Sequence, residues 1–110
     1  LVFSNHKLIY ALTRRAKPDS LFTNIHQGAE AEKVSPSLIP KTALKIAQKI
    51  DQRLAFFPYS LYTLDFLFDN NERPWLMELN TSPGLDIIYL TGTKDDRERF
   101  FMDTVIKNLL

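Results

Sequence analysis

Short apolar runs separated by polar turns dominate the first third of the chain. Residues 1–3 and 8–12 are apolar and flank the polar tetrad Ser-Asn-His-Lys at 4–7, which predicts a β-hairpin. Residues 21–35 show no clear period and include Gly28. This stretch predicts a loop with a short strand near 32–34.

The clearest helical pattern lies in the middle of the chain. Apolar residues recur there at spacings of four, three and four, with polar residues on the other faces. That spacing predicts a helix over 40–55, with Pro40 in its first turn, because proline suits the start of a helix. The residues of the apolar stripe are Ala43, Ala47, Ile50 and Leu54.

Two strands follow, at 59–68 and 75–80, and the first of them is rich in Tyr, Leu, Phe and Thr, which is a strand composition. A polar loop at 69–74 joins them, and a regular hairpin about this loop sets Phe68 opposite Trp75. The next residues, Ser82-Pro83-Gly84, predict a turn in which Gly84 takes a positive φ.

The last segment, 94–110, predicts a closing helix that Thr93 caps. We therefore expect an α+β fold in which an antiparallel β-sheet packs with helices. The apolar side of the closing helix is expected to contain Phe101, Met102, Val105, Ile106 and Leu109.

Composition narrows the class of protein only moderately. The 110 residues are 45% hydrophobic and 25% charged, which is an ordinary balance for a globular domain. The net charge of +1 offers no electrostatic basis for a nucleic acid or a membrane surface as partner. The absence of cysteine excludes disulfides and thiolate metal sites and is typical of the cytoplasm, where we expect the protein. The chain opens on an apolar run without an initiator Met, so we expect it to be a piece of a longer protein.

An acidic cluster is the main candidate for chemistry. In the regular hairpin, Asp65 lies directly opposite Glu78, with Cβ atoms roughly 5 Å apart. Asn80 projects from the same face as Glu78, two residues further on. Like charges in this arrangement destabilise a sheet unless a cation neutralises them, and carboxylate and amide oxygens suit Mg²⁺ or Mn²⁺. The alternative is a plain solvent-facing hairpin, and a register shift of one residue would separate the two carboxylates.

Two sequence motifs resemble those of the ATP-grasp superfamily, in their residues and in their order along the chain. The first is ALTRRAK at 11–17 followed by TNIHQGA at 23–29, and the second is TLD at 63–65 followed by MELNTSPGL at 77–85. Within the superfamily, the sequence resembles the ribosomal-protein glutamate ligase branch, and its resemblance to bacterial glutathione synthetase is more distant. The resemblance implies that residues 1–110 are the C-terminal lobe of an ATP-grasp domain, whose N-terminal lobes belong to the same protein.

The resemblance also implies a role for each matching residue in binding metal and phosphate. Asp65, Glu78 and Asn80 correspond to metal ligands, where Glu78 would bridge two Mg²⁺ ions on ATP. Arg14 corresponds to a catalytic arginine that steadies the transferred phosphoryl group. Asn24 corresponds to a position near the phosphates.

The remaining implied positions concern adenine and substrate. Met77, on the strand face opposite Glu78, corresponds to an apolar residue that packs on the adenine. Gly28, Ser82 and Gly84 correspond to positions near the substrates. The implied reaction joins a carboxylate substrate to an amine acceptor through an acyl phosphate, and homo-oligomerisation is left open.

One departure keeps a second interpretation open. Phe22 stands where the glutamate-ligase branch usually has another arginine, and the lysines and glycine-rich lid of the adenine side are not in these 110 residues. The alternative function is a degenerate ATP-grasp-like module that serves binding or assembly without catalysis.

Overall fold

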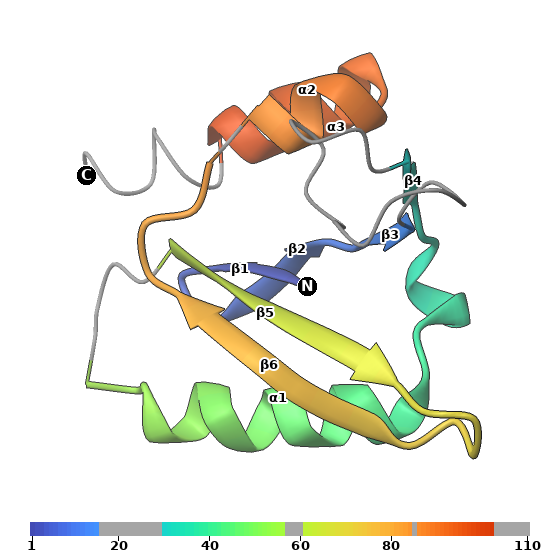
Figure 1. Cartoon of the computed structure of the whole chain (residues 1–110). Coiled ribbons are helices and arrows are strands. Elements are labelled where there is room, and N and C mark those ends of the chain that lie inside the picture. The colour runs from blue at the N-terminus through green and yellow to red at the C-terminus, as the bar shows by residue number, and fades with distance from the viewer. Residues whose placement is uncertain (16–29, 57–60, 85, 103–110) are drawn as a thin grey trace.

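The computed structural model describes residues 1–15, 30–56, 61–84 and 86–102. A four-stranded antiparallel sheet has the order β2-β1-β5-β6, and β3 pairs with β4 in a separate two-stranded sheet. One helix, α1, lies along one side of the larger sheet, and α2 and α3 lie on the other side (Figure 1). This arrangement confirms the expected α+β class. The elements are β1 (Val2–Ser4), β2 (Lys7–Tyr10), β3 (Leu12–Arg15), β4 (Glu30–Lys33), the 3₁₀ helix η2 (Pro36–Leu38), α1 (Lys41–Arg53), β5 (Leu61–Phe68), β6 (Pro74–Asn80), α2 (Asp86–Thr91) and α3 (Lys94–Phe101).

The first hairpin forms where the polar tetrad predicts it. Ser4 pairs with Lys7, and the two residues between them, Asn5 and His6, have φ angles of 49° and 65°. Two consecutive positive φ angles are characteristic of the tight turn whose twist matches that of the flanking strands. The chain then continues through Ala11 into β3, which leaves the larger sheet to pair with β4. The expected short strand near 32–34 is confirmed as β4.

The core lies on both faces of the larger sheet. On the α1 side, the rings of Phe3 and Tyr62 stack with centroids 5.1 Å apart. Ala47 and Leu64 complete that cluster. On the side of α2 and α3, the buried cluster consists of Val2, Tyr10, Ile88 and Phe100.

The α1 helix confirms the apolar stripe of the middle segment. Ala43 and Ala47 are buried, so this face packs on the sheet. Pro40 is not in the first helical turn as expected, because its ψ of 129° makes it the residue before the helix. The proline therefore limits where α1 begins.

A polar network fastens the first hairpin to α1. Oδ1 of Asp51 accepts a hydrogen bond from the hydroxyl of Tyr62 at 2.6 Å and lies 3.0 Å from Nδ1 of His6. Burial and the Asp51 carboxylate raise the pKa of the Tyr62 phenol, so this side chain stays protonated and donates. His6 is thus both a turn residue, as expected, and a contact to α1.

The closing helix α3 begins as predicted but buries a different side. The Thr93 hydroxyl accepts from the Asp96 amide, and the Asp96 carboxylate accepts from the Thr93 amide, which is a capping box. Asp96 and Phe100 are the buried residues of α3, whereas Phe101 and Met102 are 47% and 53% exposed. The expected apolar side is therefore wrong for these two residues, because the inward face follows Asp96 and Phe100 one turn apart. Residues 103–110, with the rest of the expected stripe, lie outside the described residues.

A partly buried ion pair joins α3 to β4. The Lys33 ammonium lies 2.6 Å from Oδ2 of Asp96, whose side chain is only 5% exposed. Lys33 also lies 5.8 Å from the centroid of the Tyr10 ring. The smaller sheet is thereby held against the helices on that side of the molecule.

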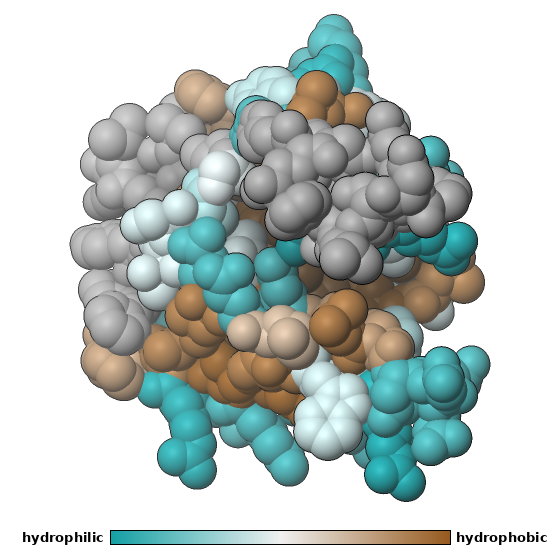
Figure 2. Space-filling view, viewed as in Figure 1, coloured by the Kyte–Doolittle hydropathy of each residue, from teal (hydrophilic) through white to brown (hydrophobic). Residues whose placement is uncertain are grey.

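Apolar side chains are exposed along β5 and β6. Figure 2 shows apolar surface over these strands, above the polar side chains that project from the lower edge of this view. The exposed apolar residues of the two strands are Leu67, Phe68, Trp75, Leu76, Met77 and Leu79. Within the described parts of the chain, no helix is long and apolar enough to cross a membrane.

Candidate metal and phosphate site

The two acidic residues predicted to face each other do so. In the β5–β6 ladder, Asp65 is the register partner of Glu78, and Thr63 is the partner of Asn80. Tyr62 and Leu64 point to the α1 side, so the alternate positions Thr63 and Asp65 face the other way. The oxygen-bearing side chains of Asp65, Glu78 and Asn80 therefore share the face of the sheet opposite α1.

A β-bulge sets this register, and it corrects the expected hairpin. Phe68 pairs with Pro74 rather than with Trp75, so the loop is one residue shorter than expected. The register then shifts between Asp65 and Phe66, which leaves Met77 without a partner. The shorter loop and the extra residue cancel, and Asp65 still meets Glu78.

The bulge also removes the basis on which the position of Met77 was predicted. Strict alternation of faces along β6 was the basis for placing Met77 opposite Glu78, and a bulge interrupts that alternation. Alternation therefore no longer assigns Met77 to a face, and its position opposite Glu78 stays a prediction. Met77 is 60% exposed, so its side chain is accessible from solvent in the described part of the structure.

Arg14 reaches the acidic pair from the smaller sheet. Its Nη2 lies 2.6 Å from Oδ2 of Asp65, and each side chain is about one-third exposed (34% and 33%). β3 carries Arg14 in register with Ala31 of β4. The sequence separation of 51 residues explains why no local pattern could predict this contact. Among the described residues, the cation in direct contact with the acidic pair is this guanidinium, and the Leu1 ammonium also interacts electrostatically with Asp65.

Glu78 and Asn80 differ from Asp65 in what they contact. Among the described residues, the Glu78 carboxylate forms no hydrogen bond or ion pair, and Glu78 is exposed. The Asn80 Oδ1 accepts a hydrogen bond from the Ser82 amide at 2.9 Å. This contact identifies the amide oxygen and fixes its direction, while a carbonyl oxygen retains a second lone pair for another ligand.

These donors fit a hard divalent cation. Two carboxylates and one oriented amide oxygen are ligands that Mg²⁺ and Mn²⁺ prefer, and such ions complete their shell with water and substrate phosphates. Within the described ranges, no three His, Cys, Asp or Glu side chains are grouped to hold a metal. The third protein ligand would therefore be the Asn80 amide.

The turn after β6 differs in detail from its prediction. The φ of Gly84 lies outside the left-handed region, so the expected positive φ is wrong here. A Cβ added to Gly84 would lie 3.2 Å from an oxygen of the Asp86 carboxylate. Asp86 begins α2, a six-residue helix that the sequence pattern did not predict. Ser82 and Gly84 are both exposed beside the acidic face.

Two predicted site residues, Asn24 and Gly28, lie in the segment 16–29, outside the described residues. Phe22, which departs from the glutamate-ligase pattern, lies in the same segment. Their expected roles stay predictions.

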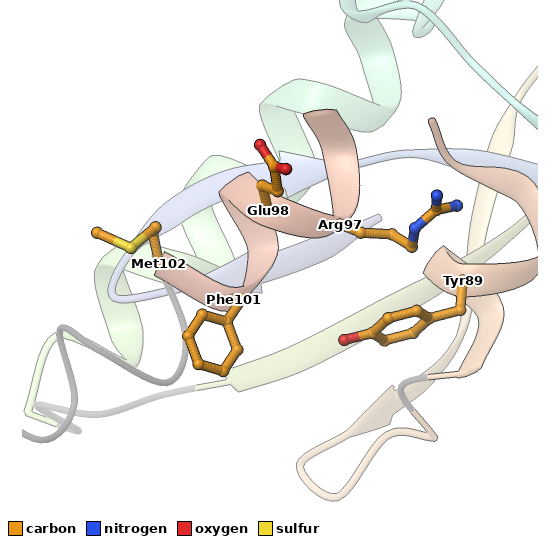
Figure 3. A pocket seen from close by; sticks show the side chains of 5 residues that line it. All are labelled: Tyr89, Arg97, Glu98, Phe101 and Met102. Atoms are coloured by element: carbon orange, nitrogen blue, oxygen red, sulfur yellow. The ribbon is translucent and has the colours of Figure 1, made fainter. Parts of the chain in front are cut away.

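A separate shallow depression of about 420 Å³ lies between α2 and α3. Figure 3 shows the rings of Tyr89 on α2 and Phe101 on α3 projecting towards the same space, with Arg97 alongside. Glu98 and Met102 complete its lining. None of the predicted metal or phosphate residues belongs to it.

Comparison with known proteins agrees with this fold. The family model described as YheC/D-like ATP-grasp matches residues 4–106, which is most of the chain. The chain therefore belongs to the ATP-grasp proteins.

Several relatives have the same name. Proteins named "Probable alpha-L-glutamate ligase" from Pseudomonas savastanoi pv. phaseolicola and from Azotobacter vinelandii are each 35% identical to this chain over 91 residues. The aligned part covers 81% of this chain and 27% of each relative. The chain thus spans about a quarter of the length of these relatives.

Proposed function

We propose that this chain is the C-terminal lobe of an ATP- and Mg²⁺-dependent carboxylate–amine ligase. The observation that carries the proposal is the register pair Asp65–Glu78, with Asn80 on the same face and Arg14 in contact with Asp65. Membership of the ATP-grasp family supports the use of ATP. In this proposal the N-terminal lobes of the same protein supply the other side of the nucleotide site.

Asp65, Glu78 and Asn80 would hold the metal. When bound, a divalent cation draws charge from the phosphate oxygens and so lowers the cost of transferring the terminal phosphoryl group. The chain's own residues orient the site, because the Ser82 amide fixes the Asn80 oxygen and the β5–β6 ladder fixes the spacing of the carboxylates. Met77 and Asn24 are proposed contacts to the adenine and the phosphates.

The proposed reaction has two steps. A substrate carboxylate oxygen attacks the γ-phosphorus of ATP, the bond to the β-phosphate oxygen breaks, and ADP leaves. The acceptor amine then attacks the acyl carbon, the carbon–oxygen bond breaks, phosphate leaves and the amine loses a proton. Negative charge builds up on the phosphoryl oxygens in both steps, and the always-charged Arg14 guanidinium is suited to stabilise it. Gly28, Ser82 and Gly84 are the proposed neighbours of the substrates.

The names of the relatives indicate which amine to test first. Because they are called probable α-L-glutamate ligases, glutamate is the acceptor that we propose to assay, with a peptide carboxylate as donor. The cytoplasm, where ATP and glutamate are abundant, is the proposed location.

The test is Mg²⁺-dependent ATP turnover by the intact protein. Glu78→Gln removes one ligand charge at nearly constant shape and should lower turnover by about a hundredfold or more, as losses of key electrostatic groups do. Glu72→Gln, in the exposed loop of the same hairpin, is the matched control and should retain turnover. Full activity in Glu78→Gln would refute the metal assignment.

A second candidate is an ATP-grasp module without catalysis. Phe22, in place of the usual arginine, is the observation that favours it. Calorimetry of the intact protein with Mg-ATP separates the two functions. A ligase must bind Mg-ATP, so a binding isotherm supports the ligase, and no binding heat at millimolar nucleotide would favour the module that serves assembly.

A further inference from the structure

Asp65 and Asp96 each form an ion pair at 2.6 Å, but the two pairs lie in different surroundings. The Asp96 carboxylate is almost fully buried and also caps α3, so the Lys33–Asp96 pair is part of the architecture. Asp65 and Arg14 are each about one-third exposed. Neither residue has another ion pair among the described residues. The Arg14–Asp65 pair is therefore accessible to ions from solvent, whereas the Asp96 carboxylate is not.

The acidic face requires a positive charge. Asp65 and Glu78 are register partners, and like charges directly opposite each other destabilise a ladder. A guanidinium offers donors but no acceptor and keeps its charge at any physiological pH. Arg14 can therefore neutralise Asp65 but cannot share the same carboxylate oxygen with a second cation without strong repulsion.

We propose that Arg14 is an exchangeable counter-cation that holds Asp65 until a divalent metal replaces it. Metal binding then breaks the Arg14–Asp65 pair and releases the guanidinium at the edge of the site. This inference rests on the proposed metal site. It adds a coupling between metal binding and Arg14. The guanidinium that is proposed to stabilise the transferred phosphoryl group becomes available when the metal binds.

The placement of Arg14 suits such an exchange. It lies near the end of β3, which among the described strands pairs with β4 and is separate from the sheet that carries the acidic residues. Figure 1 shows β3 leaving the edge of the larger sheet. A long side chain on this strand can leave Asp65 without a change in the β5–β6 ladder. Because a partly exposed ion pair changes an equilibrium by only about fivefold or less, a divalent ion can displace it.

The first measurement is a Mn²⁺ titration of the intact protein, followed by water proton relaxation. Arg14→Gln removes the competing cation and should tighten Mn²⁺ binding by about fivefold. Arg15→Gln, one residue further along β3, removes the same charge and is the matched control. It should change the Mn²⁺ affinity by less than about twofold, because salt screens a charge that does not contact the ligands.

The second measurement follows the wild-type protein by NMR. The Nε–Hε resonance of Arg14, which is assigned by its absence in Arg14→Gln, should shift as Mg²⁺ is added. The shift should follow the same binding curve as the metal. A resonance that stays fixed while the metal binds would overturn the exchange, as would equal tightening by Arg14→Gln and Arg15→Gln.

These outcomes separate the inference from the proposed function. If the metal binds and Arg14 does not respond, the exchange is wrong and the ligase proposal stands. If neither the wild-type protein nor the variants bind Mn²⁺ in the presence of nucleotide, the metal site is wrong, and the exchange falls with it.

Discussion

Asp65 and Glu78 are register partners on neighbouring antiparallel strands, and the ladder reaches this pairing through a bulge at Met77. The bulge adds one residue to β6 just before Glu78, so that both carboxylates face away from α1. Arg14 offsets the charge of one of them. This relationship defines the acidic face on which the proposed ligase function depends.

The position of the bulge leads to a prediction about chain length. Deleting Met77 makes the ladder continuous and leaves Glu78 opposite Asp65, so Mn²⁺ affinity should stay within about twofold of wild type. Deleting Leu79 moves Asn80 into the position opposite Leu64, on the α1 side, and should abolish Mn²⁺ binding. The measurement is a Mn²⁺ titration of both intact variants after circular dichroism has shown that they fold. Equal affinities in the two deletions would contradict the register.

The close approach at Gly92 should be sensitive to a methyl group. A Cβ there would lie 2.6 Å from the carbonyl oxygen of Ile88 and 3.0 Å from the Cβ of Asp96. Gly92→Ala should lower the free energy of unfolding by about 1–3 kcal/mol, because backbone must shift to make room. Gly84→Ala is the control and should cost less, since its contact is with a side-chain oxygen. Thermal unfolding of both variants measures the difference.

The Lys33–Asp96 pair predicts a loss of stability in acid. Burial opposes ionisation of Asp96, but the hydrogen bonds from Lys33 and Thr93 outweigh it and hold the pKa of this carboxyl below its usual value. The native state then binds fewer protons than the unfolded state. The ionised Asp96 therefore adds to the free energy of unfolding. This contribution is complete above the unfolded pKa of about 3.9 and is lost as the pH falls through the pKa of Asp96 in the native state.

Asp96→Asn tests this dependence by urea unfolding between neutral pH and pH 3. The variant should lose about 1–2 kcal/mol at neutral pH, because the cap and the ion pair weaken, and its stability should fall less steeply in acid. Glu98→Gln removes only the exposed contact to Lys94 at 3.7 Å, so it is the control and should cost less than about 0.5 kcal/mol. A variant that stays as acid-sensitive as wild type would show that Asp96 is not the cause.

The Tyr62 phenol predicts the opposite behaviour in base. Burial, together with Asp51, raises its pKa, so the native state retains a proton that the unfolded state loses. The stabilisation is fully present below the unfolded pKa of about 10 and is lost as the pH rises above it. Tyr62→Phe should cost about 1 kcal/mol at neutral pH and flatten the decline of stability between pH 9 and 11. Tyr89→Phe, which removes an exposed phenol, should leave the steepness of that decline unchanged, as measured by denaturant unfolding.

Local patterns predicted much of the fold. The spacing of Ala43 and Ala47 predicted α1, and the polar tetrad at 4–7 predicted the first turn, because both features depend on neighbours along the chain. The pairing of Asp65 with Glu78 was also predicted. That success depended on two errors that cancelled, since the loop is one residue shorter than expected and an unpredicted bulge adds one residue to β6.

The remaining features depend on contacts between distant segments. Arg14 meets Asp65 across 51 residues and Lys33 meets Asp96 across 63, and no periodicity records such pairs. The six residues of α2 are too few for a helical period to be recognised. The inward side of α3 was misjudged because a charged residue, Asp96, is buried there and compensated by a lysine from β4.

The metal site can be tested most directly by anomalous scattering from crystals of the intact protein grown with Mn²⁺ and a non-hydrolysable ATP analogue. We predict an anomalous peak within about 2.5 Å of carboxylate oxygens of Asp65 and Glu78 and of the Asn80 amide oxygen, with phosphate oxygens completing the shell. Manganese held with the nucleotide by other side chains, while Asp65 and Glu78 face solvent, would contradict the account.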